Sequence, residues 1–189
     1  KLDGLLHAQK FEDGQSNPTF RIVAESGTYV LRRQPPCELL KSAHAVDREF
    51  RVQRALARTS IPVAAVYHLC EDPQVIGSMF YVMDFCDGRV FRDAALPEVE
   101  RSERAPIYEE MVRVLAAIHA VDLDATQLRE FGRPGNYYER QFTRWEGQYR
   151  ASELEPIDAM EQLVGWIGGH LPPDDGRVSL VDGDFRLHN

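Results

Sequence analysis

Cysteine, clustered histidine and long apolar runs are all scarce in this sequence of 189 residues. The three cysteines, Cys37, Cys70 and Cys86, lack the paired spacing of a metal-binding or redox motif, so we expect reduced thiols. The six histidines form no His-Glu-x-x-His pattern or other close cluster, which argues against structural zinc. No run approaches the roughly 18–20 apolar residues that cross a bilayer, and the first residues do not resemble a signal peptide. We therefore expect a cytoplasmic protein.

Positive charge is also in deficit, because 22 Lys and Arg stand against 30 Asp and Glu and give a formal net charge of −8. So acidic a chain lacks the broad basic surface of a nucleic-acid-binding protein and would be repelled by anionic lipid. We expect neither a nucleic-acid nor a membrane partner, although a local basic pocket is compatible with this balance. With 43% hydrophobic and 28% charged residues, the composition is that of a globular protein of one domain or two small lobes.

The first part of the chain predicts a small sheet with one helix. Alternating apolar and polar residues predict strands at residues 19–24, 28–33, 63–70 and 79–85. A turn at Glu25-Ser26-Gly27 joins the first two strands as a hairpin. Pro35 ends the second strand, because proline cannot donate to a strand ladder. An amphipathic pattern over residues 43–58 predicts the helix.

After Gly88 the apolar pattern becomes mainly helical. Three helices are predicted, with apolar stripes over residues 107–118, 138–149 and 160–167. A short apolar strand over residues 178–181 follows. The predicted fold class is therefore α+β, with a sheet lobe over residues 1–86 and a helical lobe over residues 87–189.

The second helical stripe is aromatic and consists of Tyr138, Phe142, Trp145 and Tyr149. Its spacing is most simply that of a core-facing helix, and the alternative is that it lines a pocket for a substrate. Arg140 and Arg144 flank this stripe. We interpret them as part of a solvated helix face, with binding of an anionic acceptor such as a CoA phosphate as the alternative.

The most informative segment follows the strand predicted at residues 178–181. A carboxylate at Asp184 and an amide at Asn189 match the spacing of a kinase catalytic loop. There the Asp accepts or orients the proton of the attacking hydroxyl, and the Asn oxygen coordinates magnesium. Arg186 would meet the transferring phosphate. The same spacing is common in ordinary polar turns, so the interpretation needs support from the rest of the chain.

A cation is predicted on the buried face of the hairpin. Strand alternation places Arg32 on the same face as Val30, so it needs an anionic partner. Glu49 shares a helical stripe with Val52 and Leu56, which directs its carboxylate inward. Together Arg32 and Glu49 would form the cation–carboxylate pair with which kinases position nucleotide phosphates. The alternative is two charges on a partly solvated rim.

Two weaker patterns also indicate nucleotide binding. Backbone N–H groups around Gly14, supported by Ser16 and Asn17, would form an anion nest above phosphates, although an ordinary turn has the same composition. The strand at residues 79–85 runs out toward the junction of the two lobes. Backbone donors and acceptors there would meet the edge of an adenine ring, and without other support this segment is merely a strand end.

Six short motifs are spread along the chain: Gly-Gln-Ser-Asn at 14–17, Tyr-Val-Leu-Arg at 29–32, Ser-Ala-His-Ala-Val-Asp-Arg-Glu at 42–49, Val-Ile-Gly-Ser-Met-Phe-Tyr-Val-Met at 75–83, Leu-Ala-Ala-Ile-His at 115–119 and Gly-Asp-Phe-Arg-Leu-His-Asn at 183–189. In order and spacing they resemble the aminoglycoside phosphotransferase family, and more narrowly the branch whose kinase-like module is also found fused to acyl-CoA dehydrogenases. The resemblance implies a protein-kinase-like two-lobed fold and phosphorylation of a small-molecule hydroxyl with ATP and Mg²⁺. The narrower resemblance implies a hydroxyacyl-CoA or hydroxy acid as acceptor, the broader one an aminoglycoside.

The resemblance also implies roles for individual residues. Asp184 would be the catalytic base or hydroxyl-orienting residue, and Asn189 a magnesium ligand. Arg32, held by Glu49, would stand where kinases usually have the phosphate-binding lysine. The remaining nucleotide contacts would come from Ser16 and Asn17 above the phosphates, from backbone groups of Asp84 and Cys86 on adenine, and from Met83 behind that ring.

Two departures from the family pattern affect these expectations. Asp182 stands where the family usually has a histidine, and like charges so close to Asp184 would raise an apparent pKa or displace the loop. The family also continues beyond the position of Asn189 with a second magnesium-binding Asp and several helices, so we expect the sequence to be a fragment or an incomplete record. The alternative function is a catalytically inactive module that binds nucleotide or a partner.

Overall fold

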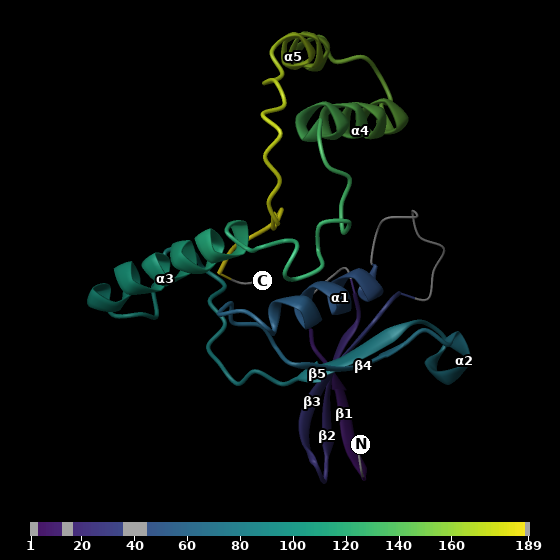
Figure 1. Cartoon of the computed structure of the whole chain (residues 1–189), viewed down its shortest axis with the longest axis vertical. Helices are drawn as coiled ribbons and strands as arrows, with labels where there is room; N and C mark the ends of the chain where they lie inside the picture. Colours follow the sequence, from purple (N-terminus) through teal and green to yellow (C-terminus); the bar gives the residue numbers. More distant parts are fainter. Residues whose placement is uncertain (1–3, 13–16, 36–44, 188–189) are drawn as a thin grey trace.

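The structure, a computed structural model, describes residues 4–12, 17–35 and 45–187. Its first part is an antiparallel sheet of five strands in the order β1-β2-β3-β5-β4. The strands are β1 (Leu5–Lys10), β2 (Thr19–Ala24), β3 (Gly27–Arg33), β4 (Val66–Cys70) and β5 (Phe80–Asp84). The helices are α1 (Val46–Leu56), α2 (Pro73–Ile76), α3 (Arg101–His119), α4 (Tyr137–Ser152) and α5 (Asp158–Gly169). The α+β fold class is confirmed, and the long helices follow the sheet (Figure 1).

The predicted hairpin is formed by β2 and β3. Ala24 pairs with Gly27 across a tight turn, and Gly27 has a φ of +139°, a backbone conformation that favours glycine. The register then places Arg32 opposite Thr19 of β2. On its other side β3 pairs with β5, where Arg32 lies opposite Tyr81. Arg32 is therefore flanked by a hydroxyl-bearing side chain on each neighbouring strand.

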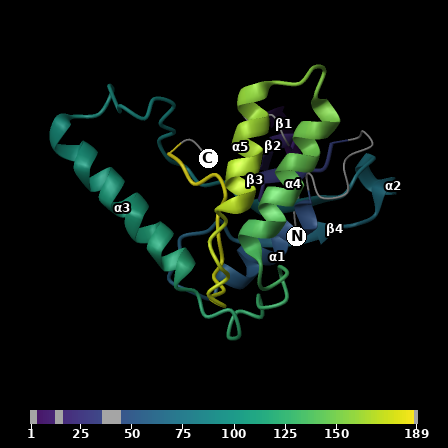
Figure 2. The ribbon, with the colours of Figure 1, turned by 90° about the horizontal axis from the view of Figure 1, so that it is seen from above.

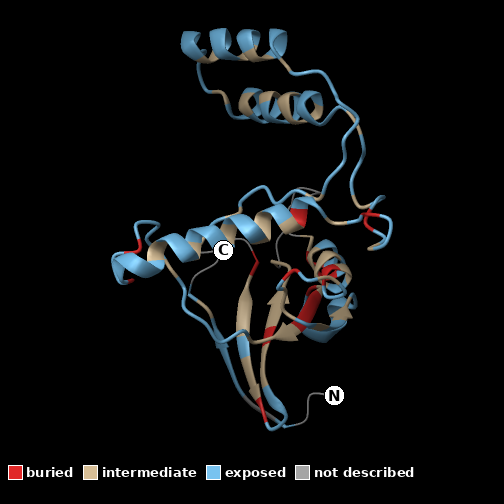
Figure 3. Ribbon diagram, turned by 60° about the vertical axis from the view of Figure 1, so that its left-hand side comes forward, coloured by how far each residue is buried: buried red, intermediate tan, exposed pale blue. Residues whose placement is uncertain are grey.

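Helix α1 lies against the sheet because one of its faces is apolar. Val46 and Phe50 are buried together with Tyr81 of β5 in one core cluster, and the rings of Phe50 and Tyr81 meet edge to face at 6.0 Å. Figure 3 shows buried residues on α1 and on the sheet. Acidic residues in the first turn, Glu49 among them, complement the positive end of the helix dipole. Burial of the apolar face thus fixes the direction in which Glu49 points.

A second core cluster joins α1 to the helical part of the chain. Its buried residues are Leu56, Ile61, Ile118, Leu123 and Leu128. Leu180 and Phe185, near the end of the described chain, pack against this cluster. Because these two residues flank the segment that contains Asp184, the cluster anchors that segment beside the ends of α1 and α3.

Helices α4 and α5 pack side by side, and two extended connectors join them to the rest of the molecule (Figures 1 and 2). Phe142 of α4 faces Gly168 of α5, where a Cβ atom would lie only 3.2 Å from the Phe142 ring. The interpretation of the aromatic stripe as a core face is wrong for two of its four residues. Tyr138 and Trp145 are 55% and 60% exposed, because among the described residues α4 packs mainly on α5.

The strand predicted over residues 178–181 is also wrong. This segment is extended but pairs with no strand among the described residues, and Val178 and Val181 are 42% and 53% exposed. Leu180 alone turns toward the core. The apolar pattern over residues 178–181 therefore reflects one side chain, Leu180, that anchors the segment to the core, and not a strand paired in a sheet.

Two elements were not expected. β1 is an edge strand with a register shift between Leu5 and His7, so its sequence shows no clean alternation. α2 is a single turn, with Asp72 as its N-cap and Gly77 at a φ of +86° after its last residue. Cys70 and Cys86 are free thiols as expected, whereas Cys37 lies outside the described residues. None of the described helices has the length and apolar character needed to cross a membrane.

Candidate functional site

An ion pair between β3 and α1 forms the centre of the site. The Arg32 Nε donates to Glu49 Oε2 at 2.7 Å, and Arg32 Nη2 donates to Glu49 Oε1 at 3.3 Å. The contact is therefore bidentate, the strong form of an arginine–carboxylate pair. The two side chains are 27% and 31% exposed, so the pair is neither fully buried nor free in solvent. The pairing expected from the sequence is present.

Neutral side chains complete the hydrogen bonding of the pair. Asn17 Nδ2 donates to Glu49 Oε1 at 2.8 Å, and the Tyr81 hydroxyl donates to Glu49 Oε2 at 3.1 Å. Thr19 Oγ1 accepts from Arg32 Nη1 at 3.2 Å. Because Asn17 bonds to Glu49, one residue of the predicted phosphate loop lies directly at the pair. Asn17 is also buried, with only 2% of its surface exposed. Ser16, the other residue predicted in this loop, lies outside the described residues.

Tyr81 is a site residue that sequence reasoning did not find. Its side chain is fully buried, and its hydroxyl both donates to Glu49 and accepts from Gln53 Nε2 at 3.1 Å. Burial, followed by the nearby Glu49 carboxylate, raises the pKa of Tyr81 well above its ordinary value of 10. The hydroxyl is thus a stable donor to Glu49. Strand alternation indicates that Tyr81 points inward, but only the β3–β5 pairing shows that it faces Arg32.

The predicted adenine-binding segment lies at the end of β5. The Asp84 backbone N–H donates to the carbonyl of Ala65 at 2.8 Å, so this donor is already used within the protein. The Tyr67 hydroxyl donates to the Asp84 carboxylate, and this bond raises the pKa of Tyr67. Met83 is half-buried and packs against the core under α1, whereas Cys86 is exposed just beyond the strand.

The segment that contains Asp184 is held by local polar contacts and by an apolar anchor. Asp182 Oδ1 accepts from the Asp184 backbone N–H at 2.9 Å, so the carboxylate at the unusual position supports the loop. Arg186 Nη2 lies 2.9 Å from Asp184 Oδ2. Phe185 packs on the core cluster that also contains Leu56 of α1. Asn189, the predicted magnesium ligand, lies outside the described residues.

Helix α1 connects the two halves of the site. Glu49 and Val52 are three residues apart, which is about 4.5 Å along a helix axis. Val52 packs against the same core cluster as Phe185. One rigid helix therefore carries both the partner of Arg32 and the surface on which the Asp184 segment rests. No group of three or more His, Cys, Asp or Glu side chains that could hold a metal occurs in the part of the chain that the structure describes.

A sheet that presents a cation–glutamate pair, followed by helices and an Asp-containing segment, resembles the arrangement of kinase-like phosphotransferases, in which the cation is usually a lysine. A model of the phosphotransferase enzyme family (APH) matches residues 7–189. The chain therefore belongs to this family, as the motifs led us to expect.

The relatives include much longer proteins that are named as acyl-CoA dehydrogenases. Acyl-CoA dehydrogenase family member 10 of Mus musculus is 48% identical over 186 residues, which cover 98% of this chain and 17% of that protein. The probable acyl-CoA dehydrogenase IBR3 of Arabidopsis thaliana is 48% identical over 192 residues, which cover 95% of this chain and 23% of that protein. The chain thus spans less than a quarter of the length of these relatives.

Two solved structures share the fold. A candidate aminoglycoside phosphotransferase from Ralstonia eutropha superimposes with a TM-score of 0.83 at 48% identity, covering 98% of this chain and 54% of that chain. Macrolide 2′-phosphotransferase from Brachybacterium faecium superimposes with a TM-score of 0.57 at 17% identity, covering 99% of this chain and 62% of that chain. The second likeness shows the fold alone.

Proposed function

We propose that the protein transfers the γ-phosphoryl group of ATP to a hydroxyl of a small molecule. The observation that carries this proposal is the bidentate Arg32–Glu49 pair, fixed on the helix that also supports the Asp184 segment. Family membership supports phosphotransfer in general, and the nucleotide, the metal ion and the acceptor are our proposals.

Arg32 is suited to hold nucleotide phosphates. A guanidinium has five N–H donors, and three of these are used by Glu49 and Thr19. The other two N–H groups would donate to phosphate oxygens, with Asn17 and the predicted Ser16 beside them. Because the guanidinium is already clamped, little side-chain entropy would be lost when the nucleotide binds. The carbonyl of Asp84 and backbone groups of Cys86 would meet adenine, with Met83 behind the ring.

Asp184 would act on the acceptor. Its carboxylate would orient the acceptor hydroxyl and take its proton while the hydroxyl oxygen bonds to the γ-phosphorus and the bond to the ADP oxygen breaks. Arg186, already beside Asp184, would face the charge on the transferring group. Phosphoryl transfer needs mainly positioning and charge stabilisation, which these groups supply.

A magnesium ion, when bound, would neutralise phosphate charge. Asn189 has an amide oxygen, the ligand type that magnesium prefers. We assign the ion to Asn189 on this chemistry, and Asp184 acts on the acceptor.

The two resemblances leave three acceptor classes open. Relatives named as acyl-CoA dehydrogenase family members favour a hydroxyacyl-CoA or hydroxy acid, and the candidate aminoglycoside phosphotransferase favours an aminoglycoside. The full-length protein should therefore be incubated with MgATP and members of all three classes, and phosphorylated products sought by mass spectrometry.

Asp184→Asn tests the mechanism within that assay. We expect loss of about 10²-fold or more in kcat, typical of a lost general base, with ATP affinity retained. Asp158→Asn, at the exposed start of α5, is the matched control and should leave the rate unchanged. Equal rates for Asp184→Asn and its parent would remove Asp184 from the mechanism.

A second candidate is a module that binds nucleotide without catalysis. The Asp184–Arg186 ion pair and the presence of Asp182 favour it, because both engage the segment that would have to meet the acceptor. Thermal melts show whether ATP binds, since ATP at 100 times its Kd adds roughly 2.7 kcal/mol of stability whether or not turnover occurs, and the product assay then distinguishes the two functions. A shift without any phosphorylated product would support the second candidate.

A further inference from the structure

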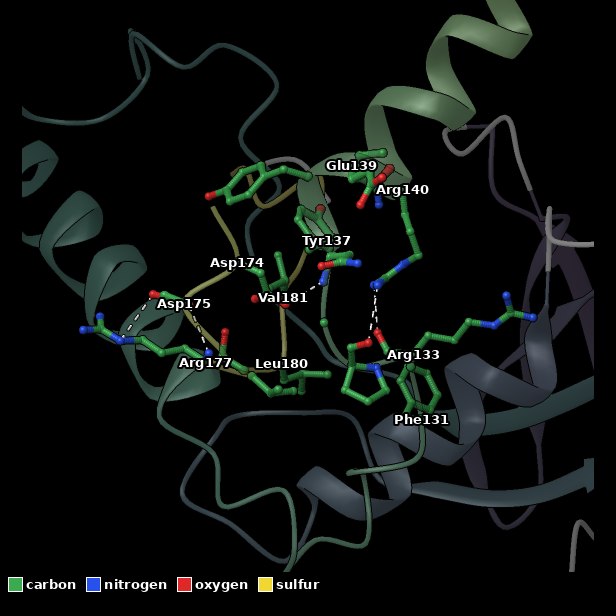
Figure 4. A pocket seen from close by; sticks show the side chains of 18 of the residues that line it. Phe131, Arg133, Tyr137, Glu139, Arg140, Asp174, Asp175, Arg177, Leu180 and Val181 are labelled. Carbon is green, nitrogen blue, oxygen red and sulfur yellow. Dashed lines mark hydrogen bonds and ion pairs between the residues drawn. The ribbon is translucent and has the colours of Figure 1, made fainter. Parts of the chain in front are cut away.

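A groove separate from the Arg32–Glu49 pair lies between the two connectors of the α4–α5 hairpin. One wall comes from the loop that leads into α4 and from the first turn of α4, and the other from residues 171–181 (Figure 4). Its volume is about 970 Å³, at the upper end of the range for small-molecule sites. Phe131 and Tyr137 provide apolar surface along it.

The two walls are tied together by a polar contact. Asp174 Oδ2 accepts from the Asn136 backbone N–H at 2.7 Å, and Asp174 Oδ1 accepts from Gly176 N–H at 3.0 Å. Gly135 approaches this carboxylate so closely that a Cβ atom would lie 3.1 Å from it, at a φ of +72°. Arg140 is also fixed, because its Nη2 donates to the carbonyl of Arg133 at 2.8 Å. The groove is therefore built from both connectors and is not a chance gap.

The lining of the groove is positively charged, although the chain has a net charge of −8. Its cationic residues are Arg48, Arg129, Arg133, Arg140 and Arg177. Its acidic residues are Glu139, Asp174 and Asp175, which leaves an excess of two positive charges.

Carboxylates neutralise only some of these arginines. Arg129 pairs with Asp124, and Arg177 pairs with Asp175. Arg48, Arg133 and Arg140 have no carboxylate at ion-pair distance among the described residues. Arg48 instead lies over the Phe131 ring, with its guanidinium carbon 4.0 Å from the ring centroid, and its Nη2 donates to the Phe131 carbonyl at 2.9 Å. Arg133 and Arg140 are therefore the cations that we consider for a ligand.

The groove ends close to the proposed catalytic residue. Val181 lines it, and Asp184 is three residues further along the chain. Consecutive Cα atoms are 3.8 Å apart, so the Cα atoms of these residues lie within about 11 Å of each other. Leu180 lines the groove and packs on the same core cluster as Phe185. A small molecule in the groove would thus be able to extend a hydroxyl toward Asp184.

We propose that this groove binds the anionic end of the phosphoryl acceptor, with Arg133 and Arg140 holding a carboxylate or phosphate group. This inference rests on the proposed phosphotransfer and selects among its acceptors. A guanidinium matches the two oxygens of a carboxylate or phosphate. An aminoglycoside, which is a polycation, would be repelled by the same lining.

A series of acceptors that share one hydroxyl tests the inference in the full-length protein. 3-Hydroxybutyrate carries a carboxylate, 3-hydroxybutyryl-CoA carries phosphates, and methyl 3-hydroxybutyrate carries neither. We expect kcat/KM to be at least about tenfold higher for one of the two anions than for the neutral ester. The anion that is preferred identifies the source of the charge. Kanamycin serves as the cationic comparison and should be the poorest acceptor.

The double variant Arg133→Gln/Arg140→Gln tests the two arginines themselves. It should raise the KM of the preferred anion about tenfold or more and leave the KM of ATP unchanged. Arg144→Gln is the matched control on α4, because Arg144 lies over the Trp145 ring and does not line the groove. It should behave as the parent protein. Equal kcat/KM for the anions and the neutral ester, or an unchanged KM in the double variant, would overturn the proposal.

A binding measurement separates the inference from the proposed function. Coenzyme A is titrated calorimetrically into the parent protein and both variants, with a saturating non-hydrolysable ATP analogue present. Binding that is lost in Arg133→Gln/Arg140→Gln and kept in Arg144→Gln supports the groove even if no acceptor is phosphorylated, in which case only phosphotransfer fails. If 3-hydroxybutyrate is the preferred acceptor, it replaces coenzyme A as the titrant. If neither coenzyme A nor 3-hydroxybutyrate shows binding that depends on these arginines, the proposal for the groove is overturned whatever the transfer assay shows.

Discussion

Replacing Tyr81 by phenylalanine removes one oxygen atom from the centre of the site. The ring, its fully buried position and its edge-to-face contact with Phe50 would be retained. Glu49 would lose one of its hydrogen bonds, and Gln53 Nε2 would lose its acceptor. The variant therefore isolates the hydroxyl from the packing.

The expected loss of stability follows from these two bonds. A hydrogen bond to a charged group contributes about 1.5–3 kcal/mol and a neutral one about 0.5–1.5 kcal/mol. Because the Glu49 side chain is 31% exposed, water replaces part of the lost interaction. We expect Tyr81→Phe to lower the free energy of unfolding by about 2 kcal/mol, or about 4–8 °C in Tm for a chain of this size.

Alkaline pH gives the same prediction an independent test. The pKa of Tyr81 is raised on folding, chiefly by burial, so the folded protein retains a proton that the unfolded chain loses above pH 10. The stabilisation that comes from the raised pKa of Tyr81 is therefore complete below pH 10. It is lost as the pH rises through the pKa of Tyr81 in the folded protein. The slope for one proton is at most about 1.4 kcal/mol per pH unit.

Urea denaturation from pH 8 to pH 11 measures both effects. The parent should lose stability above pH 10 more steeply than Tyr81→Phe. Tyr137→Phe, at a 48% exposed ring, is the control and should follow the parent. Our account of the hydroxyl would be refuted by two results together. The unfolding free energy of Tyr81→Phe at pH 8 would be less than about 0.5 kcal/mol below that of the parent, and the two proteins would lose stability in parallel above pH 10.

Three further substitutions test other parts of the structure. Arg32→Lys should raise the KM of ATP in steady-state kinetics, because a lysine cannot bind Glu49 and Thr19 together through a planar fork. Asp182→Ala should lower kcat without changing ATP affinity, and Asp182→Asn, which keeps an acceptor for the Asp184 N–H, should restore it. Gly135→Ala should destabilise the protein in urea by about 1–2 kcal/mol, whereas Gly147→Ala in the open middle of α4 should stabilise it by up to about 1 kcal/mol. A rate for Asp182→Asn as low as that for Asp182→Ala, or equal stability of the two alanine variants, would contradict these interpretations.

Local patterns predict the parts of the fold in which each residue's environment depends on its own element. Alternation predicts the β2–β3 hairpin, and the stripe shared with Val52 and Leu56 predicts that Glu49 points inward. An ion pair could be inferred from these two facts because a half-buried cation needs a partner. The lobe boundary at residue 86 and the roles of individual site residues stay predictions.

Patterns fail where the environment depends on which elements meet. The sheet order places β5 and not β4 beside β3, and only this order brings Tyr81 to Glu49. The stripe that contains Trp145 shows an amphipathic helix but not the extent to which a partner covers it. In the same way, no local feature of Arg140 shows that residues 171–181 lie opposite it.

The hydrogen bonds of Glu49 define what this residue can do. A carboxylate offers about four lone-pair positions, and Glu49 accepts two bonds from Arg32, one from Asn17 and one from Tyr81. An additional ligand, such as a metal ion, would have to displace one of these donors. Glu49 is therefore a positioning residue, whereas Arg32 still has two N–H groups to offer. This asymmetry leaves N–H donors and no free acceptor at the pair, which is why we propose a nucleotide phosphate and not a cation as its ligand.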